Sequence, residues 1–376
     1  MNKRPLGILL LLSLTALGNA DGKKEAIPIA AIFGLTGRAA TSNTRHLKGA
    51  QLAVEEVNAK GGVLGHPLDL ITLDNESTAV GSAEAAKKAA AKNVAAIVGA
   101  SWSDHSLAIA PIAQSAGIPM ISNYSTNPKV TRVGNYIFRT CYVDTFQAGI
   151  MARFARQRLK LNRVAILFES GSEYSVGLSV YFRKEFDRLG GIVIAAVPYL
   201  KDSLDFSDQL RQIQEARPQA IYLPAYPKEA GMVMRQASKI GVRVPFLGSD
   251  SWGDTMVQFL GGPVRDGYEV KPWSPKSPNP LNRQFVLAYR KKFGEDHEDL
   301  SGSALAYDAV MLLVDAIRRA GTPERAKIRE ALEKTTGFQG VTGPIRFDPE
   351  RNPIKGAVIN RYKNSTTSSY FTTVEP

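Results

Sequence analysis

The feature that most constrains the fold is an alternation of short apolar runs with amphipathic stretches, which occurs twice along the chain. Each succession contains four runs rich in β-branched residues: 27–33, 68–73, 95–98 and 119–122, then 164–168, 192–197, 220–223 and 245–247. Continuous apolar strands separated by helices are typical of parallel sheets that are covered on both faces. The sequence therefore predicts an α/β protein with two doubly wound parallel-sheet lobes.

The stretches between these runs have the period of a helix. In residues 44–60, Leu47, Ala50, Val54 and Val57 fall on one stripe of a helix, and a Gly-Gly pair then ends it. Further helices are expected at 79–92, 103–116, 175–189, 206–216, 228–240, 281–293, 301–320 and 323–335. Residues 271–280 contain four prolines and are therefore a candidate for a crossing between the lobes.

The first twenty residues have the pattern of an export signal. Lys3 and Arg4 precede a short apolar stretch, and the small residues Gly18 and Ala20 follow it. This order is typical of a secretory signal that is cleaved after Ala20. The apolar stretch is shorter than the ~20 residues that span a bilayer. We therefore expect residues 1–20 to be a signal peptide and the mature protein to be periplasmic.

Composition and missing motifs argue against several classes of function. The 376 residues carry a net charge of +12, but their basic residues are dispersed without aromatic interleaving, so nucleic acid is not an expected partner. Cys141 is the single cysteine, which excludes an intramolecular disulfide. The chain has no phosphate-binding glycine motif, no paired histidines for zinc and no nucleophile elbow. We expect no enzyme activity, no catalytic residues, no metal and no cofactor.

Polar loops follow two of the first four strands. Residues 99–106 and 123–128 present hydroxyls and backbone N–H groups where parallel strands end, which is where open sheets bind ligands. The first loop also leads into a helix, whose N-terminus favours an anion such as a carboxylate. Two plainer interpretations remain open, in which Ser103 only caps this helix and Asn127 with Pro128 only forms a turn.

The corresponding loops of the second succession combine a carboxylate with aromatic rings. They are residues 169–174, 224–227 and 248–253, and the last contains Asp250. A carboxylate beside rings in a cleft suits an ammonium group. The alternative is that Asp250 serves only as a helix N-cap.

Several ordered segments resemble one protein family. Residues 49–65, GAQLAVEEVNAKGGVLG, are similar to the opening helix of the leucine/isoleucine/valine-binding proteins of bacterial ABC transporters. Further matches are 117–128 (GIPMISNYSTNP), 174–177 (YSVG), 205–207 (DFS), 235–237 (RQA) and 246–248 (FLG). The resemblance runs in order from about residue 27 to residue 363. Each motif is weak alone, but the ordered set is specific.

The resemblance implies a type I periplasmic binding fold, in which three crossovers join two lobes that close on a ligand. Residues 27–144 with 273–345 would form lobe I, which binds a carboxylate. Residues 145–272 with 346–376 would form lobe II, which binds an ammonium group. The implied function is a monomeric solute-binding protein that captures an amino acid and delivers it to an inner-membrane ABC permease. A ligand-sensing receptor module for an amino acid, amide or aromatic carboxylate is the alternative.

Site residues follow from the resemblance by position. Ser103 and the loop of Tyr124, Ser125 and Thr126 match the groups that hold the ligand carboxylate. Tyr226 and Asp250 match the residues that take the ammonium group.

Two further positions complete the implied site. Tyr174 matches an aromatic residue that often covers the ligand. Trp102 is included because it stands where the family often has a small residue.

The site also departs from the family's pattern in ways that concern specificity. Tyr124, like Trp102, stands where the family often has a small residue, and Ser42 stands where a ring is common. Bulky rings could shrink the side-chain pocket or stack on an aromatic ligand. The sequence therefore leaves the identity of the ligand open, and leucine or valine cannot be assumed.

Overall fold

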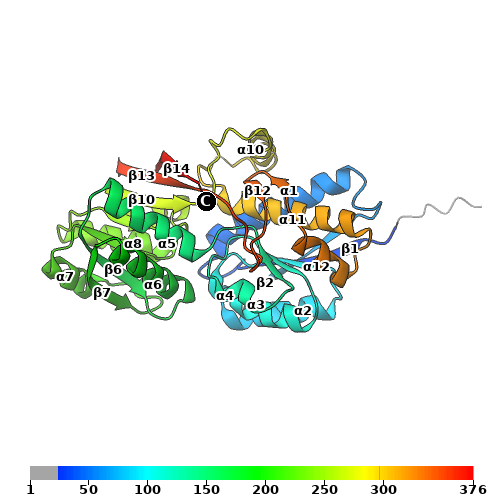
Figure 1. The fold of residues 1–376 in the computed structure, drawn as a ribbon, viewed down its shortest axis with the longest axis horizontal. Helices are drawn as coiled ribbons and strands as arrows, with labels where there is room; N and C mark the ends of the chain where they lie inside the picture. The colour runs from blue at the N-terminus through cyan, green and yellow to red at the C-terminus, as the bar shows by residue number, and fades with distance from the viewer. Residues whose placement is uncertain (1–23, 296, 376) are drawn as a thin grey trace, which may run out of the picture.

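The computed structural model describes residues 24–295 and 297–375. The expected signal segment, residues 1–20, lies outside the described residues. Two large sheets, each flanked by helices, build two lobes that lie side by side (Figure 1). We call the lobe on the five-stranded sheet lobe I and the lobe on the seven-stranded sheet lobe II.

The sheet of lobe I is entirely parallel, and its strands follow the order β2-β1-β3-β4-β5. The strands are β1 (Ile27–Phe33), β2 (Leu68–Asp74), β3 (Ala96–Gly99), β4 (Met120–Ser122) and β5 (Ile137–Arg139). The helices between them are α1 (Ala40–Ala59), α2 (Ala79–Ala91), α3 (Ser103–Ser115) and the short α4 (Lys129–Arg132). Strands β1, β3 and β4 are apolar and buried, which explains why their sequence pattern was clear, whereas β2 at the edge is only partly buried and β5 was not expected.

The sheet of lobe II has the order β14-β13-β10-β9-β8-β6-β7. Its first strands are β6 (Arg163–Glu169), β7 (Ile192–Tyr199), β8 (Ala220–Leu223), β9 (Phe246–Gly248) and β10 (Val264–Lys271). The helices are α5 (Asp144–Arg153), which continues into a π-turn at Phe154–Arg158, α6 (Glu173–Arg188), α7 (Ser207–Ala216), α8 (Pro227–Lys239) and α9 (Asp254–Leu260). Every expected strand and helix of both successions is present within two residues, except that α1 begins four residues early.

The predicted parallel sheet of lobe II is confirmed for β6 to β10, and an antiparallel hairpin that was not expected extends it at one edge. Strand β13 (Ala357–Ser365) runs antiparallel to β10, and β14 (Ser369–Val374) forms a hairpin with it. The register Tyr268↔Arg361 places the middle of β13 beside the middle of β10. These two strands are partly exposed and mix polar with apolar residues, so they lack the apolar run by which a buried parallel strand is recognised.

The later helices return to lobe I. They are α10 (Pro280–Phe293), α11 (Ser301–Ala320) and α12 (Arg325–Glu333), followed by a small hairpin of β11 (Phe338–Gly340) and β12 (Gly343–Ile345). Helix α11 packs along α1 and against β3 and β4. The chain therefore passes between the two sheets three times: after β5, after β10 and before β13. The exact lobe boundaries expected from the sequence stay a prediction.

The predicted apolar stripe of α1 forms part of the lobe I core. Its four residues are all buried in one cluster with α11, and burying one large apolar side chain contributes roughly 1.5–3 kcal/mol. The two helices approach closely at Gly49, where an added Cβ would lie 2.0 Å from the carbonyl oxygen of Ser303. Among the residues that the structure describes, no helix is long and apolar enough to cross a membrane.

Candidate ligand-binding site

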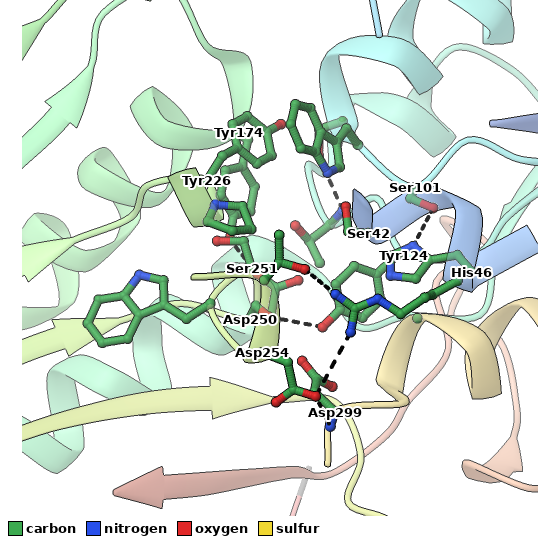
Figure 2. Close-up of a pocket in the computed structure, with 18 residues that line it drawn as sticks. Ser42, His46, Ser101, Tyr124, Tyr174, Tyr226, Asp250, Ser251, Asp254 and Asp299 are labelled. Carbon is green, nitrogen blue, oxygen red and sulfur yellow. Dashed lines mark hydrogen bonds and ion pairs between the residues drawn. The ribbon is translucent and has the colours of Figure 1, made fainter. Parts of the chain in front are cut away.

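A cavity lies between the two lobes, at the carboxyl ends of strands from both sheets (Figure 2). It contains about 600 Å³ not filled by protein atoms, part of which is open to solvent. Seven of the eight residues expected from the sequence line it: Trp102, Ser103, Tyr124, Thr126, Tyr174, Tyr226 and Asp250. The rule that open parallel sheets bind ligands beyond their strand ends thus locates the cavity correctly.

Ser103 is the first residue of α3, and it does not cap that helix. The helix begins after Trp102 and has no side-chain cap. The Ser103 Oγ accepts hydrogen bonds from the backbone N–H groups of Thr126 (3.3 Å) and Asn127 (3.2 Å). Because these bonds use the lone pairs of the hydroxyl, its own proton remains available to a ligand. The interpretation of Ser103 as a mere cap is therefore wrong.

Thr126 brings a second hydroxyl to the same wall. Its Oγ1 is buried and has no hydrogen-bond partner, whereas its carbonyl accepts from the N–H of Asp144 at 2.8 Å. An unpaired buried hydroxyl costs about 1–3 kcal/mol, which a ligand acceptor would recover. The lobe I wall thus offers neutral donors that are held in place by the backbone.

Ser125 is the expected site residue that does not line the cavity. Its hydroxyl lies 3.1 Å from the carbonyl oxygen of Ala100 and 2.7 Å from Ser106 Oγ, and its N–H donates to Ser122 Oγ. These bonds anchor the loop after β4 to the loop after β3. The side chain of Ser125 therefore positions its neighbours and is turned away from the cavity.

Asp250 is one of two carboxylates that the described residues of lobe II bring to the cavity, the other being Asp254. Asp250 is buried, and the Tyr174 hydroxyl donates to its Oδ1 at 2.6 Å. Burial raises the pKa of this carboxyl, while the hydrogen bond from Tyr174 acts in the opposite direction. Helix α9 begins at Asp254 after Gly253, so the alternative that Asp250 caps a helix is also wrong.

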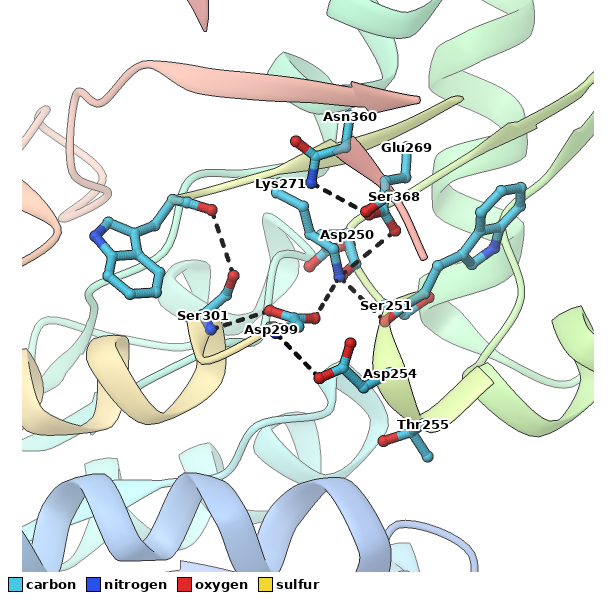
Figure 3. A network of polar contacts seen from close by, with 12 residues as sticks. Asp250, Ser251, Asp254, Thr255, Glu269, Lys271, Asp299, Ser301, Asn360 and Ser368 are labelled. Carbon is cyan, nitrogen blue, oxygen red and sulfur yellow. Dashed lines mark hydrogen bonds and ion pairs between the residues drawn. The ribbon is translucent and has the colours of Figure 1, made fainter. Parts of the chain in front are cut away.

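A polar network behind Asp250 holds its loop in place (Figure 3). The Lys271 ammonium donates to the carbonyl oxygens of Asp250 (2.6 Å) and Trp252 (3.1 Å) and to Asp299 Oδ2 (2.8 Å). Burial would raise the pKa of Asp299, but the Lys271 charge outweighs it and lowers that pKa to about 2. Lys271 therefore fixes the backbone of Asp250, and its charge is shared between Asp299 and the more distant Glu269, whose Oε2 lies 3.7 Å away.

Four aromatic rings form a continuous stack across the cleft. Trp102 of lobe I lies against Tyr226 of lobe II with ring centroids 3.8 Å apart, and His105 and Tyr174 extend the stack at 5.4 Å and 5.0 Å. The Tyr226 hydroxyl donates to Asp104 Oδ2. The Tyr226 ring is therefore stacked between Trp102 and Tyr174 at the border of the cavity, and the contact between Trp102 and Tyr226 shows that the lobes are closed.

Arg38 joins the lobes on the other side of this stack. Its guanidinium contacts both carboxylate oxygens of Glu169, at 3.1 Å and 2.5 Å, and lies 2.9 Å from Glu229 Oε2. It also lies over the rings of Trp102 and Tyr226. Burial alone would lower the pKa of Arg38, but the two carboxylates raise it above its usual value.

Sequence reasoning missed this ion cluster, because its residues are far apart in the chain. It also missed Arg45 and His46, which share a helical face of α1 with Ser42 and line the cavity. The His46 Nδ1 lies 2.9 Å from Ser101 Oγ, and burial lowers its pKa to about 3, so the ring is neutral at neutral pH. The spacing of Ser42, Arg45 and His46 at i, i+3 and i+4 was the available signal in the sequence that they share one face of a helix.

Among the described residues, no three acidic, histidine or cysteine side chains are grouped to hold a metal ion.

Comparisons with known proteins agree with this architecture. Residues 26–364 match the family model described as periplasmic binding protein. The leucine-, isoleucine-, valine-, threonine- and alanine-binding protein of Pseudomonas aeruginosa is 28% identical over 343 residues, covering 90% of each chain. A leucine-binding protein of Thermotoga maritima superposes with a TM-score of 0.89 at 36% identity, covering 93% of this chain and 99% of that one.

Two more solved structures are similar to the chain in fold. A branched-chain amino acid transporter substrate-binding protein of Streptococcus pneumoniae, solved with isoleucine, has a TM-score of 0.87 at 30% identity and covers 93% and 100% of the two chains. A solute-binding protein of Rhodopseudomonas palustris, solved with benzoate, has a TM-score of 0.83 at 18% identity, covering 93% and 97%, and shares the fold alone. The chain therefore belongs to the leucine/isoleucine/valine-binding protein family, the periplasmic substrate-binding proteins of ABC transporters.

Proposed function

We propose that this protein captures an α-amino acid between its lobes, with the carboxylate on lobe I and the ammonium group on lobe II. The observation that carries the proposal is the pairing of two available hydroxyls, on Ser103 and Thr126, with the buried carboxylate of Asp250 across one cavity. Neutral donors suit a carboxylate, and a carboxylate beside the rings of Tyr174 and Tyr226 suits an ammonium group. The Pseudomonas, Thermotoga and Streptococcus relatives, whose names state amino acid ligands, support the same class.

Binding follows from the order in which the two walls meet the ligand. The ligand carboxylate first reaches lobe I, whose donors are already held by backbone contacts. Closure then brings Asp250 and the aromatic rings onto the ammonium group and excludes water, which strengthens the hydrogen bonds on both walls. No bond is made or broken, so the protein acts as a carrier and requires no cofactor.

The proposal also covers the export, the oligomeric state and the membrane partner of the protein. The protein is exported with a signal peptide that is cleaved after Ala20, acts as a monomer and presents its closed form to an inner-membrane permease. Mass spectrometry of the protein purified from the periplasm tests the cleavage site, because a mature chain that starts elsewhere contradicts it. Co-purification with a permease in the presence of ligand tests the partner.

The ligand assignment is tested by the variant Asp250→Asn. The loss of one member of a buried charge pair costs on the order of 2–5 kcal/mol, so the affinity for the amino acid should fall at least about tenfold. A thermal-shift screen of α-amino acids first identifies a binder, and calorimetry then measures its dissociation constant. The matched control is Asp208→Asn, which changes an exposed carboxylate on α7 of the same lobe. An unchanged affinity in Asp250→Asn would refute the proposed role of Asp250.

A further inference from the structure

We propose that the ligand is an amino acid with a neutral, hydrogen-bonding side chain, and specifically a carboxamide, which Arg45 and the carboxylates facing it recognise. This inference rests on the proposed function, because it assumes that Ser103, Thr126 and Asp250 hold the α-groups. It concerns the remaining part of the cavity, which contacts the ligand side chain.

Within the described part of the chain, the walls of the cavity contain no aliphatic side chain apart from the ring of Pro227. Among the described residues that line it, none is alanine, valine, leucine, isoleucine, methionine or phenylalanine. Its apolar surface comes from aromatic rings and Pro227, and the other lining residues are polar, charged or glycine. The rings and Pro227 offer apolar contact, but beside Arg45 and Asp254 a branched aliphatic side chain would leave buried polar groups without partners.

Arg45 lies at the centre of this polar part. It projects from α1 of lobe I towards lobe II, where its Nη2 donates to Thr255 Oγ1 at 2.5 Å and its Nη1 lies 3.9 Å from Asp254 Oδ2. A guanidinium in this position offers several N–H donors in a plane. Figure 2 shows that Asp254 and Asp299 lie together beyond Asp250, so acceptors stand next to these donors.

The far end of the cavity is also polar. Ser42 and Ser101 line it together with the neutral ring of His46. An added Cβ on Gly302 would lie 2.0 Å from His46 Nε2, so this glycine allows the imidazole to lie against the start of α11. Serine and neutral histidine can each donate or accept a hydrogen bond, which again favours a polar side chain.

The balance of charge indicates that the side chain is neutral. Three carboxylates line the cavity, of which Asp299 forms an ion pair with Lys271 and Asp254 faces Arg45. Asp250 remains for the α-ammonium group. A cationic side chain would meet Arg45, and an anionic one would compete with Asp254 for it. A carboxamide carries no charge and offers both an acceptor and a donor.

The ring stack argues against a flat aromatic side chain between the lobes. The centroids of Trp102 and Tyr226 are 3.8 Å apart, which is ordinary stacking contact and leaves no space for a third ring between them. Tyr124 occupies a further part of the cleft, where its hydroxyl donates to the carbonyl oxygen of Asp250. The open space therefore lies on the polar side of the rings.

Two series of amino acids of matched shape test the inference by calorimetry. Asparagine, aspartate and leucine share one branched skeleton, and glutamine, glutamate and homoleucine share the next longer one. We expect the amide of at least one series to bind on the order of tenfold or more tighter than both its acid and its alkyl counterpart. An acid or an alkyl member that binds tightest in both series overturns the inference.

The failure of this inference can be told apart from failure of the proposed function. If leucine or another α-amino acid binds but no amide is preferred, only the side-chain assignment is wrong. If no α-amino acid binds in the wider thermal-shift screen, both proposals are wrong.

The variant Arg45→Met links the preference to its proposed cause. Replacing the guanidinium by an apolar chain should reduce the preference for the amide over its alkyl counterpart on the order of tenfold. The ratio of the two affinities is the readout, because a general loss of closure affects both ligands alike. The control is Lys48→Met, which removes a cation from the same helix that pairs with Glu295 outside the cavity. A preference that is unchanged in Arg45→Met, or reduced equally in Lys48→Met, overturns the assignment.

Discussion

The two walls of the cleft differ in charge. On lobe I, Ser103 and Thr126 present neutral hydroxyls that backbone contacts hold in place. On lobe II, Asp250 faces the cavity, and Glu169 and Glu229 lie on the other side of the ring stack. Asp250 therefore faces neutral donors across the cavity, whereas the lobe I cation Arg45 faces Asp254.

The difference shows what each contact across the cleft can do. Arg38 of lobe I forms ion pairs with Glu169 and Glu229 of lobe II. This contact between the lobes therefore forms without a ligand. Asp250 has no such partner from lobe I, and the proposed ligand ammonium fills that role. The Arg38 ion pairs thus stabilise the closed form in the protein itself, whereas the contact at Asp250 stabilises it only when a ligand is bound.

The largest expected effect on ligand affinity comes from the variant Arg38→Met, which removes the ion pairs with Glu169 and Glu229. In the closed state this variant leaves two buried carboxylates side by side without a cation, and breaking such a pair costs about 3–5 kcal/mol. Opening exposes the carboxylates to water, so the variant should favour the open form. Ligand affinity should fall by about a hundredfold or more, measured by calorimetry.

Small-angle scattering supplies an independent readout for Arg38→Met. The variant should remain more open than the wild type at the same ligand concentration. The control is Arg188→Met, whose exposed pair with Glu185 contributes about 0–1 kcal/mol. Equal affinities of the wild type and Arg38→Met would show that the cluster does not contribute to closure.

A smaller effect is expected on the neutral wall, from Ser103→Ala. This change removes one donor to the ligand carboxylate and two acceptor contacts to the loop after β4. Hydrogen bonds to charged groups contribute about 1.5–3 kcal/mol, so affinity should fall roughly ten- to a hundredfold. The α-amide of the same ligand lacks the carboxylate charge and should lose less affinity in the variant. An equal loss for both compounds, measured by calorimetry, would contradict the role of Ser103.

The smallest expected effect concerns Asp144, which connects the two walls at the start of α5. Its N–H donates to Thr126, and its side chain accepts from Gln147, whose Oε1 accepts from the N–H of Asp250. Burial raises the pKa of Asp144 to about 7. The folded protein therefore binds this proton more tightly than the unfolded chain does.

The sign of the pH effect follows from this raised pKa. The stabilising contribution of protonated Asp144 is fully present below about pH 4 and is lost as the pH rises through about 7. Asp144→Asn keeps a neutral side chain, so its melting temperature relative to the wild type should increase by a few degrees between pH 4 and pH 8. Calorimetric scans measure this difference, with Asp187→Asn on the exposed face of α6 as control. A difference that does not change with pH would show that Asp144 keeps an ordinary pKa in the folded protein.

The sequence predicted those parts of the molecule whose signal is local. The apolar runs located eight strands, the stripe of Leu47 and Val54 located the buried face of α1, and the polar strand ends located Ser103 and Asp250. Each of these depends on residues close together in the chain, where periodicity and capping act.

The parts that could not be predicted depend on pairings between distant residues. Arg38 meets Glu169 across 131 positions, and β13 pairs with β10 across about 90. Ser125 was expected at the site because its neighbours are there, but the direction of its hydroxyl is set by Ala100 and Ser106. Side-chain direction within a loop depends on such tertiary hydrogen bonds and leaves no periodic pattern.

The most direct test of the central claim is a crystal structure of the protein with its amino acid bound. The account predicts that the ligand carboxylate lies within hydrogen-bond distance of the hydroxyls of Ser103 and Thr126. It also predicts that the α-ammonium group contacts the carboxylate of Asp250 across the closed cleft. A ligand bound in the opposite orientation, or held without contact to Asp250, would contradict the account.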